Sequence, residues 1–197
     1  MNWTRITRGV AGAAALMLLS SAANAQVAGS AHDLSVVVGS QTNEVCVYCH
    51  TPHNANVSST APLWNRELTT TTFTMYDSPT MDMTVAGQPA GVSLACLSCH
   101  DGTIELDELY NDPWGNTASG NEMTGTAVIG ADMSADHPIS ITYDDTADLQ
   151  GGFGTLASVQ ASALPLFGAS TDQVECGSCH TVHDPAISPF LRISNAG

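Results

Sequence analysis

Positive charge is nearly absent from this chain of 197 residues. It contains no lysine, and its four cationic side chains are Arg5, Arg8, Arg66 and Arg192, against 19 acidic residues. After the first 25 residues only two arginines remain to oppose all 19 acids, which gives a net charge of −17. A surface of this sign repels phosphate backbones and anionic lipids, so we expect neither a nucleic-acid nor an anionic-membrane partner.

Long hydrophobic runs are also scarce. Hydrophobic residues make up 43% of the chain, but much of this fraction is alanine and part of it lies in the first 25 residues. Neither the period of a strand nor that of a helix persists for long. We therefore predict mostly coil with short helices and few or no strands. The expected helices are 44–51, 92–100, 103–110 and 172–181, and the expected weak strands are 126–130 and 139–143.

The first 25 residues have the pattern of an export signal. Arg5 and Arg8 precede an apolar stretch, 9–19, and Ala23-Asn24-Ala25 matches a cleavage site. The stretch is shorter than the about 20 residues that span a bilayer, which makes the alternative of a transmembrane anchor weaker. We predict a removed signal peptide, 1–25, and a single exported domain, 26–197, without a transmembrane segment. Its expected location is periplasmic, extracellular or at the cell surface.

The feature that the chain does contain is Cys-x-x-Cys-His, which occurs at 46–50, 96–100 and 176–180 and uses all six cysteines. This pattern is typical of c-type haem attachment, in which two thiols bond the porphyrin and the histidine ligates the iron. Disulfides of an exported protein and zinc sites are the alternatives, but neither requires a histidine after each cysteine pair. The motifs predict three covalent haem c groups. Their attachment residues are Cys46, Cys49, Cys96, Cys99, Cys176 and Cys179, and their proximal ligands are His50, His100 and His180.

Haem groups would also replace the missing hydrophobic core. Three large, flat macrocycles bonded to distant segments would tie the coil together, and we expect the haem-free chain to be largely unfolded, as small metal-dependent domains are. The predicted fold class is therefore a multihaem cytochrome c with the haems forming its core.

Four further histidines could supply the distal iron ligands: His32, His53, His137 and His183. His53 and His183 each follow a proximal histidine by three residues, a spacing that places two side chains on one helix face. Such a residue cannot reach the far side of its own haem, but it can ligate a neighbouring one. His137 precedes Pro138, which favours an extended backbone, and Asp136 could hydrogen-bond its ring.

His32 could equally belong to an N-terminal tail. Methionine is the rival sixth ligand and would raise the reduction potential; the available residues are Met75, Met81, Met83, Met123 and Met133. If every iron has two imidazole ligands, no coordination position is open to a substrate. We therefore expect an electron carrier and not an enzyme, since a haem reductase or peroxidase needs an open iron.

Several longer segments resemble the multihaem c-type cytochromes with doubled motifs, including the nanowire-forming outer-membrane cytochromes E and S of metal-reducing bacteria. The similar segments are 31–35, 46–55, 61–66, 96–103 and 136–140. The resemblance implies bis-histidine haems in van der Waals contact, little regular secondary structure, and extracellular electron transfer to an external acceptor. It also implies head-to-tail filaments in which a histidine of one subunit ligates a haem of the next.

A monomeric periplasmic electron carrier is the alternative function, followed by a haem reductase with one open iron. The chain departs from the family pattern in one respect. Relatives with this layout have a fourth haem motif shortly after a segment like 190–197, and four distal histidines here face three motifs. We expect either a fragment that lacks a fourth haem or a protein in which one histidine is idle.

Overall fold

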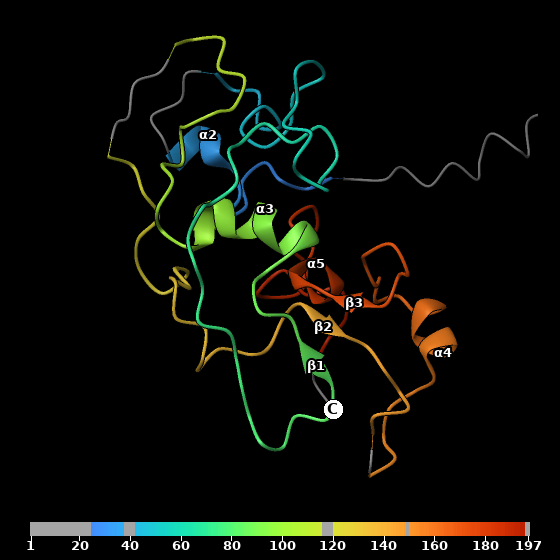
Figure 1. Cartoon of the computed structure of the whole chain (residues 1–197). Helices are drawn as coiled ribbons and strands as arrows, with labels where there is room; N and C mark the ends of the chain where they lie inside the picture. The colour runs from blue at the N-terminus through green and yellow to red at the C-terminus, as the bar shows by residue number, and fades with distance from the viewer. Residues whose placement is uncertain (1–24, 38–41, 116–119, 149, 196–197) are drawn as a thin grey trace, which may run out of the picture.

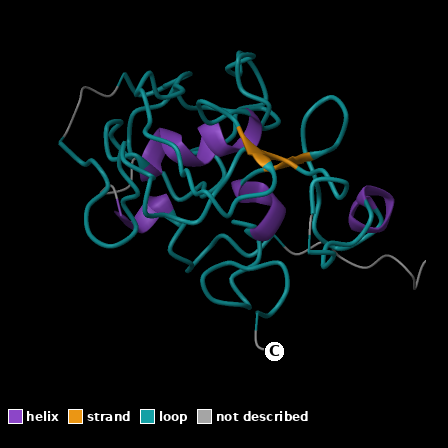
Figure 2. Ribbon diagram, turned by 60° about the horizontal axis from the view of Figure 1, so that its bottom comes forward, coloured by secondary structure: helices purple, strands orange, loops and turns teal. Residues whose placement is uncertain are grey.

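The computed structural model describes residues 25–37, 42–115, 120–148 and 150–195. Loops and turns make up most of this structure, and the helices and strands are short (Figures 1 and 2). The prediction of mostly coil with short helices and few strands is confirmed. Residues 1–24 of the predicted signal peptide lie outside the described residues.

The described elements are four short helices and one small sheet. They are α2 (Leu34–Val37), β1 (Thr84–Val85), α3 (Gly91–His100), β2 (Ile141–Thr142), α4 (Leu156–Gln160), β3 (Gln173–Val174) and α5 (Cys176–Cys179). The sheet is antiparallel with the order β1-β2-β3. Within the described part of the chain, no helix combines the length and the apolar character needed to cross a membrane.

The predicted helix 92–100 is present as α3, and the predicted strand 139–143 contains β2. The other predicted elements are shorter or absent. Residues 172–181 divide between β3 and α5, while 44–51 and 103–110 form turns and 126–130 forms no strand. In the first of these turns, the His50 N–H donates to the Cys46 carbonyl at 2.8 Å, but the next N–H, that of Thr51, donates to Leu63 instead. A long-range bond thus ends the helical turn.

The longest helix of the described residues, α3, lies between α2 and α5 (Figure 1) and contains the second cysteine motif. It ends because Gly102 adopts a left-handed backbone conformation with φ +74°, which is typical of a residue just beyond a helix C-terminus. The Gly102 N–H then donates to the Cys99 carbonyl at 3.0 Å. The helix end places His100 at the start of a loop.

Helix α5, which contains the third motif, packs directly on α3. The close approach requires a glycine, because a Cβ atom on Gly177 would lie 3.0 Å from both Val92 Cγ1 and Phe167 Cζ. At this distance the two neighbouring side chains would have to shift by a few tenths of an ångström. The second and third motifs therefore pack closely at Gly177, which lies between the two cysteines of the third motif.

The apolar core is small and divides into two clusters. One contains Leu34, Tyr48 and Leu106, and the other contains Phe73, Leu97, Met133 and Ile139. Cysteines of the motifs lie at their margins, with Cys99 against the first cluster and Cys176 against the second. The apolar contacts therefore converge on the motifs.

A buried carboxylate joins α3, β2 and α5. Glu175, only 2% exposed, accepts hydrogen bonds from the Ser93 hydroxyl and, at 2.8 Å, from the Ser140 hydroxyl. Ser93 Oγ in turn accepts from the Cys176 N–H at 3.0 Å. Burial raises the pKa of Glu175 above its usual value, and the two serine hydrogen bonds oppose that rise. The network fixes the entrance to the third motif.

Because the folded-state pKa of Glu175 is raised from 4.5, the folded state binds more protons than the unfolded state above that pH. Its free energy of unfolding should therefore fall as pH rises through the raised pKa. Glu175→Gln keeps the shape and removes the titration, so the stability of this variant relative to the wild type should grow over that interval. Urea unfolding at a series of pH values measures this difference.

Ser93→Ala is the matched control, since it removes a network hydrogen bond without removing the carboxyl group. It should destabilise the protein by about 1–3 kcal/mol and, because the lost hydrogen bond opposes the rise in the pKa of Glu175, it should keep the fall in stability with rising pH. A wild-type-to-Gln difference that stays constant with pH would contradict the assignment.

Candidate haem-binding sites

All six motif cysteines have free thiols, and none of the three pairs forms a disulfide. The described residues also contain no group of three or more histidine, cysteine or acidic side chains that could hold a metal ion directly. The histidines instead come together two at a time.

Each proximal histidine faces one of the predicted distal histidines. The ring centroids are 6.1 Å apart for His50 and His183, 6.1 Å for His100 and His32, and 6.2 Å for His180 and His137. The rings are nearly parallel in the first and third of these pairs, with interplanar angles of 27° and 18°, and more twisted in the pair of His32 and His100, at 48°.

This separation fits an iron between two imidazoles. A ligating histidine nitrogen lies about 2 Å from a first-row metal ion and about 1 Å from its ring centroid, so two imidazoles on opposite sides of one ion have centroids about 6 Å apart. The histidine pairs thus have the spacing of axial ligands.

The proximal rings are also oriented for ligation by their hydrogen bonds. Nδ1 of His50 lies 2.8 Å from the Pro62 carbonyl, Nδ1 of His100 lies 2.8 Å from the Ala127 carbonyl, and Nδ1 of His180 lies 2.9 Å from the Pro189 carbonyl. A carbonyl can only accept, so each Nδ1 must bear the proton. The unprotonated Nε2 is then the nitrogen left for a metal, which is the usual arrangement around metal-binding histidines.

The first and third motifs are surrounded by the same backbone pattern. After each motif the chain returns and pairs with it, through Thr51 N–H to the Leu63 carbonyl and Thr181 N–H to the Phe190 carbonyl, both at 2.8 Å. Isolated antiparallel bridges join His50 to Trp64 and His180 to Leu191. Leu63 and Phe190 occupy equivalent positions and both have positive φ, 54° and 62°. The two motifs therefore belong to a structural repeat.

This repeat is hard to detect in the sequence because the two returning segments begin at different distances from their histidines, 12 residues after His50 and 9 residues after His180. The two returning segments nevertheless share a short sequence pattern. Pro62-Leu63-Trp64-Asn65-Arg66 and Pro189-Phe190-Leu191-Arg192 each contain a proline, two apolar residues and an arginine. The proline of this pattern supplies the carbonyl that orients the ring of His50 in one segment and of His180 in the other.

Several buried polar atoms of the described residues have no hydrogen-bond partner. Such atoms include Nδ1 of His32, Nε1 of Trp64 and Nε of Arg66. Trp64 contacts His50 edge-on, with ring centroids 6.1 Å apart. Since buried donors normally find an acceptor, these atoms are consistent with a further polar group, such as a haem propionate, in the occupied sites.

A cavity of about 310 Å³ lies beside the pair of His32 and His100. Ala31, next to His32, and Ala127, whose carbonyl orients His100, both line it. Met123 lines the same cavity, so this predicted alternative ligand lies near one pair. The opposing position on His100 is nevertheless taken by the ring of His32.

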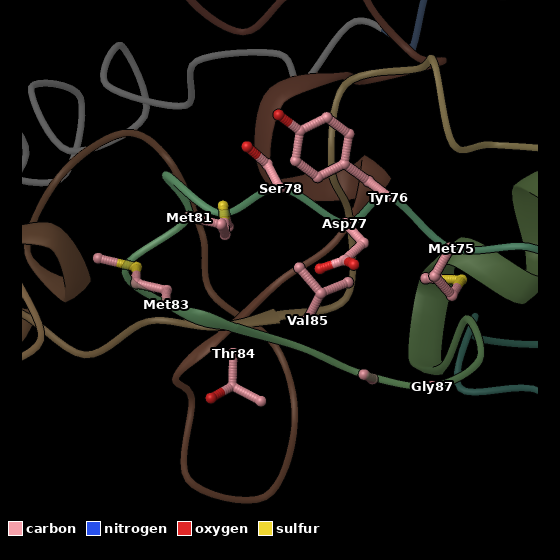
Figure 3. Close-up of a pocket in the computed structure, with 10 residues that line it drawn as sticks. Met75, Tyr76, Asp77, Ser78, Met81, Met83, Thr84, Val85 and Gly87 are labelled. Carbon is pink, nitrogen blue, oxygen red and sulfur yellow. The ribbon is translucent and has the colours of Figure 1, made fainter.

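A second cavity, of about 370 Å³, is lined by three other candidate ligands, Met75, Met81 and Met83. Figure 3 shows Met75 at one end of this cavity and Met81 and Met83 at the other. Neither a histidine nor a cysteine lines it. Met133, the remaining candidate, is buried in the second apolar cluster. The methionines are thus not grouped as axial ligands opposite the proximal histidines.

The thiols place the three motifs in a spatial order. Cys96 and Cys176, from the second and third motifs, are in hydrogen-bonding contact. Cys49 of the first motif is electrostatically coupled to Cys99 of the second, and burial followed by this neighbour raises the pKa of Cys49 to about 11. The second motif therefore contacts the third and lies near the first.

The predicted distal histidines also connect different motifs. His183 faces His50 of the first motif although it lies three residues after His180 of the third. Burial, and then the neighbouring His100 and His183, lower the pKa of His32 to about 4. Its ring is therefore neutral at pH 7, the state in which an imidazole nitrogen can ligate a metal.

His53 differs from the other predicted distal ligands. It is exposed, and among the described residues no ring contact joins it to another histidine. Its backbone carbonyl accepts from the Thr51 hydroxyl at 2.8 Å and from Asn111 Nδ2 at 3.1 Å, which fixes the loop that presents it. The structure thus separates His53 from its sequence counterpart, His183.

The two counterparts provide a matched test. His183→Ala should open one coordination position opposite His50, so that one of three low-spin ferric haems becomes high-spin and binds cyanide, whereas His53→Ala should leave all three low-spin in the monomer. Electron paramagnetic resonance with haem quantitation measures both. Retention of three low-spin haems in His183→Ala, or loss of one in monomeric His53→Ala, would overturn the pairing. His32→Ala and His137→Ala should behave as His183→Ala does.

Comparisons with known proteins add no family assignment. No model of a known protein family matches the chain, and no curated protein matches it. A functional conclusion must therefore rest on the motifs, the histidine pairs and their hydrogen bonds.

Proposed function

We propose that this chain is a multihaem c-type cytochrome that carries electrons between closely spaced haems. The observation that supports this most strongly is the set of three proximal–distal histidine pairs, each with centroids 6.1–6.2 Å apart. All three proximal rings in addition have their Nδ1 atoms on backbone carbonyls. A chance arrangement of histidines would not repeat both features at every Cys-x-x-Cys-His motif.

The residues of the chain have separate roles in this proposal. The cysteine pairs hold three haem groups covalently, and the paired imidazoles ligate each iron from both sides. The carbonyls of Pro62, Ala127 and Pro189 keep the proximal rings in one orientation. Haem iron, when bound, supplies a one-electron couple. The contacts between thiols of different motifs bring the three sites close enough for electrons to pass from one to the next.

An electron carrier fits the ligand set better than an enzyme does. Every proximal histidine has a second imidazole opposite it, so each iron would be six-coordinate and closed to substrate. A haem reductase would need one proximal histidine without an opposing ring. The predicted signal peptide places the proposed carrier outside the cytoplasm, in the periplasm or at the cell surface.

Self-association into filaments is part of the proposal. His53 is an exposed imidazole with no intramolecular ring partner among the described residues, so it is available to a neighbouring subunit. Since each of the three proposed haems already has two imidazoles, only a further haem of that subunit would have a position for His53. Four exposed apolar side chains lie on its own loop and on the loop that Asn111 joins to it: Val57, Leu63, Tyr110 and Trp114. Apolar side chains around a ligand histidine would be covered in a head-to-tail contact.

Mass spectrometry of the mature protein tests haem attachment. Each of the three motif peptides should gain the mass of one haem, and each double cysteine-to-serine variant should lose one haem. The attached groups should undergo reversible one-electron reduction without binding cyanide. A colourless chain whose motif peptides have no added mass would refute the proposal.

Electron microscopy of the secreted protein tests the assembly. The wild type should form filaments, and His53→Ala should prevent them without changing the number of haems per chain. Phe153→Ala, which removes an exposed apolar ring from a different loop, should leave them intact. Monomers in the wild-type sample would instead support a periplasmic carrier, and filaments in His53→Ala would exclude a bridging role for this histidine.

A further inference from the structure

One of the two cations that follow residue 25 is completely buried. Arg66 has 0% exposure, and its guanidinium remains protonated in proteins even when it is buried. Burial of a charge is costly unless hydrogen bonds and nearby charges compensate for it. In a chain with so few cations, the position of this charge therefore has a physical consequence.

Hydrogen bonds fix the guanidinium of Arg66 firmly. Its Nη1 donates to the Leu106 carbonyl at 2.9 Å, and its Nη2 donates to the Glu105 carbonyl. The backbone carbonyl of Arg66 accepts from Asn56 Nδ2 at 3.0 Å. Backbone carbonyls are dipoles that orient a cation without neutralising its charge. Nε is buried and has no acceptor.

This charge lies between the first two haem motifs. The preceding residue, Asn65, donates its N–H to the Cys49 carbonyl at 2.9 Å and its Nδ2 to the Val47 carbonyl at 2.8 Å. On the other side, the guanidinium is in contact with the Cys99 thiol. Arg66 therefore contacts the second motif, while Asn65 binds the first motif and the charge of Arg66 acts on Cys49 there.

The second cation after residue 25 has a different location. Arg192 Nε donates to the Gly177 carbonyl at 2.8 Å, inside the third motif. Its charge acts on Cys179 and on His183. The two arginines therefore affect the three sites in different combinations, and only Arg66 lies beside the second motif.

We propose that Arg66 raises the reduction potentials of the two haem sites attached through Cys46/Cys49 and Cys96/Cys99. This inference rests on the proposed function. An electron that enters a haem site lowers its local charge by one unit, and a fixed cation nearby stabilises the site after this change. The electron comes from the donor of the proposed electron transfer, and the charge and protonation of Arg66 do not change.

The carboxyl side chain of Asp101 provides a comparison with Arg66, because its effect on the second site has the opposite sign. It is 5% exposed, directly follows His100, and acts electrostatically on Cys99 against the effect of Arg66. Its carboxylate accepts hydrogen bonds from the hydroxyls of Thr69, Thr71 and Thr103. Asp101→Asn retains the shape of the side chain and removes its negative charge, so it should raise the potential of the second site.

The decisive variant is Arg66→Gln, which removes the charge and keeps a hydrogen-bond donor. Spectroelectrochemical titration should show that the potentials of the first and second sites fall. The expected fall is roughly 60 mV for each one-electron couple, which corresponds to a tenfold decrease in the equilibrium constant for reduction. The third site should change less. The spectral changes of His32→Ala, His137→Ala and His183→Ala assign each potential to its site.

Arg192→Gln is the matched control, because it removes the other cation. It should lower the potentials of the first and third sites and leave the second nearly unchanged. Arg66→Lys provides an independent measurement if Arg66→Gln does not load haem. A buried lysine loses its proton at a lower pH than an exposed one, so the first two potentials should fall when the pH is raised through its pKa, whereas those of the wild type should not.

A purely structural role of Arg66 would predict another result. Arg66→Gln would then weaken the fold, while the potentials of fully loaded protein would stay unchanged or shift equally at all three sites, and this would overturn the inference. The same holds if Arg66→Lys shows no fall at the first two sites over the accessible alkaline range. Absence of haem from the wild type would instead refute the proposed function itself.

Discussion

The arrangement of this protein depends on the fixed orientation of three imidazole rings by backbone carbonyls. Each carbonyl determines which ring nitrogen bears the proton and therefore which nitrogen is free for a metal. The opposing imidazoles come from distant segments, so that the pair of His100 and His32 joins α3 to the N-terminal segment. Long-range order in a chain that is mostly loop is thus concentrated where these histidines face each other.

Few other interactions could hold such a chain together. The two apolar clusters are small, α4 buries no side chain, and the sheet has two residues in each strand. Buried polar groups supply much of the remaining order, namely Glu175 between the second and third motifs and Arg66 between the first and second. Both groups have ionisable side chains. The same contacts that connect the segments therefore also determine the electrostatic environment of the proposed redox sites.

Features that depend on residues close together in the sequence could be predicted, whereas features that depend on contacts between distant segments could not. The motifs, helix α3 and the four candidate distal histidines follow from spacing and composition. The spacing of His183 from His180 pointed to a neighbouring site, but the identity of its partner, His50, requires tertiary structure. The returning segments that end at Pro62 and Pro189 differ in length, which hid the repeat. The expected helix 44–51 is replaced by a turn because Thr51 pairs with Leu63, a partner that helix propensity does not include. The burial of Arg66 was equally invisible to composition, which counts charges without placing them.

Near-infrared magnetic circular dichroism of the ferric protein tests the central claim most directly, because its charge-transfer bands distinguish the axial ligand pairs of low-spin haems. Three opposed histidine pairs predict three bis-imidazole haems per chain, with no histidine–methionine band and no high-spin fraction. A histidine–methionine band, an open iron, or fewer than three bis-imidazole haems in fully loaded protein would contradict the account.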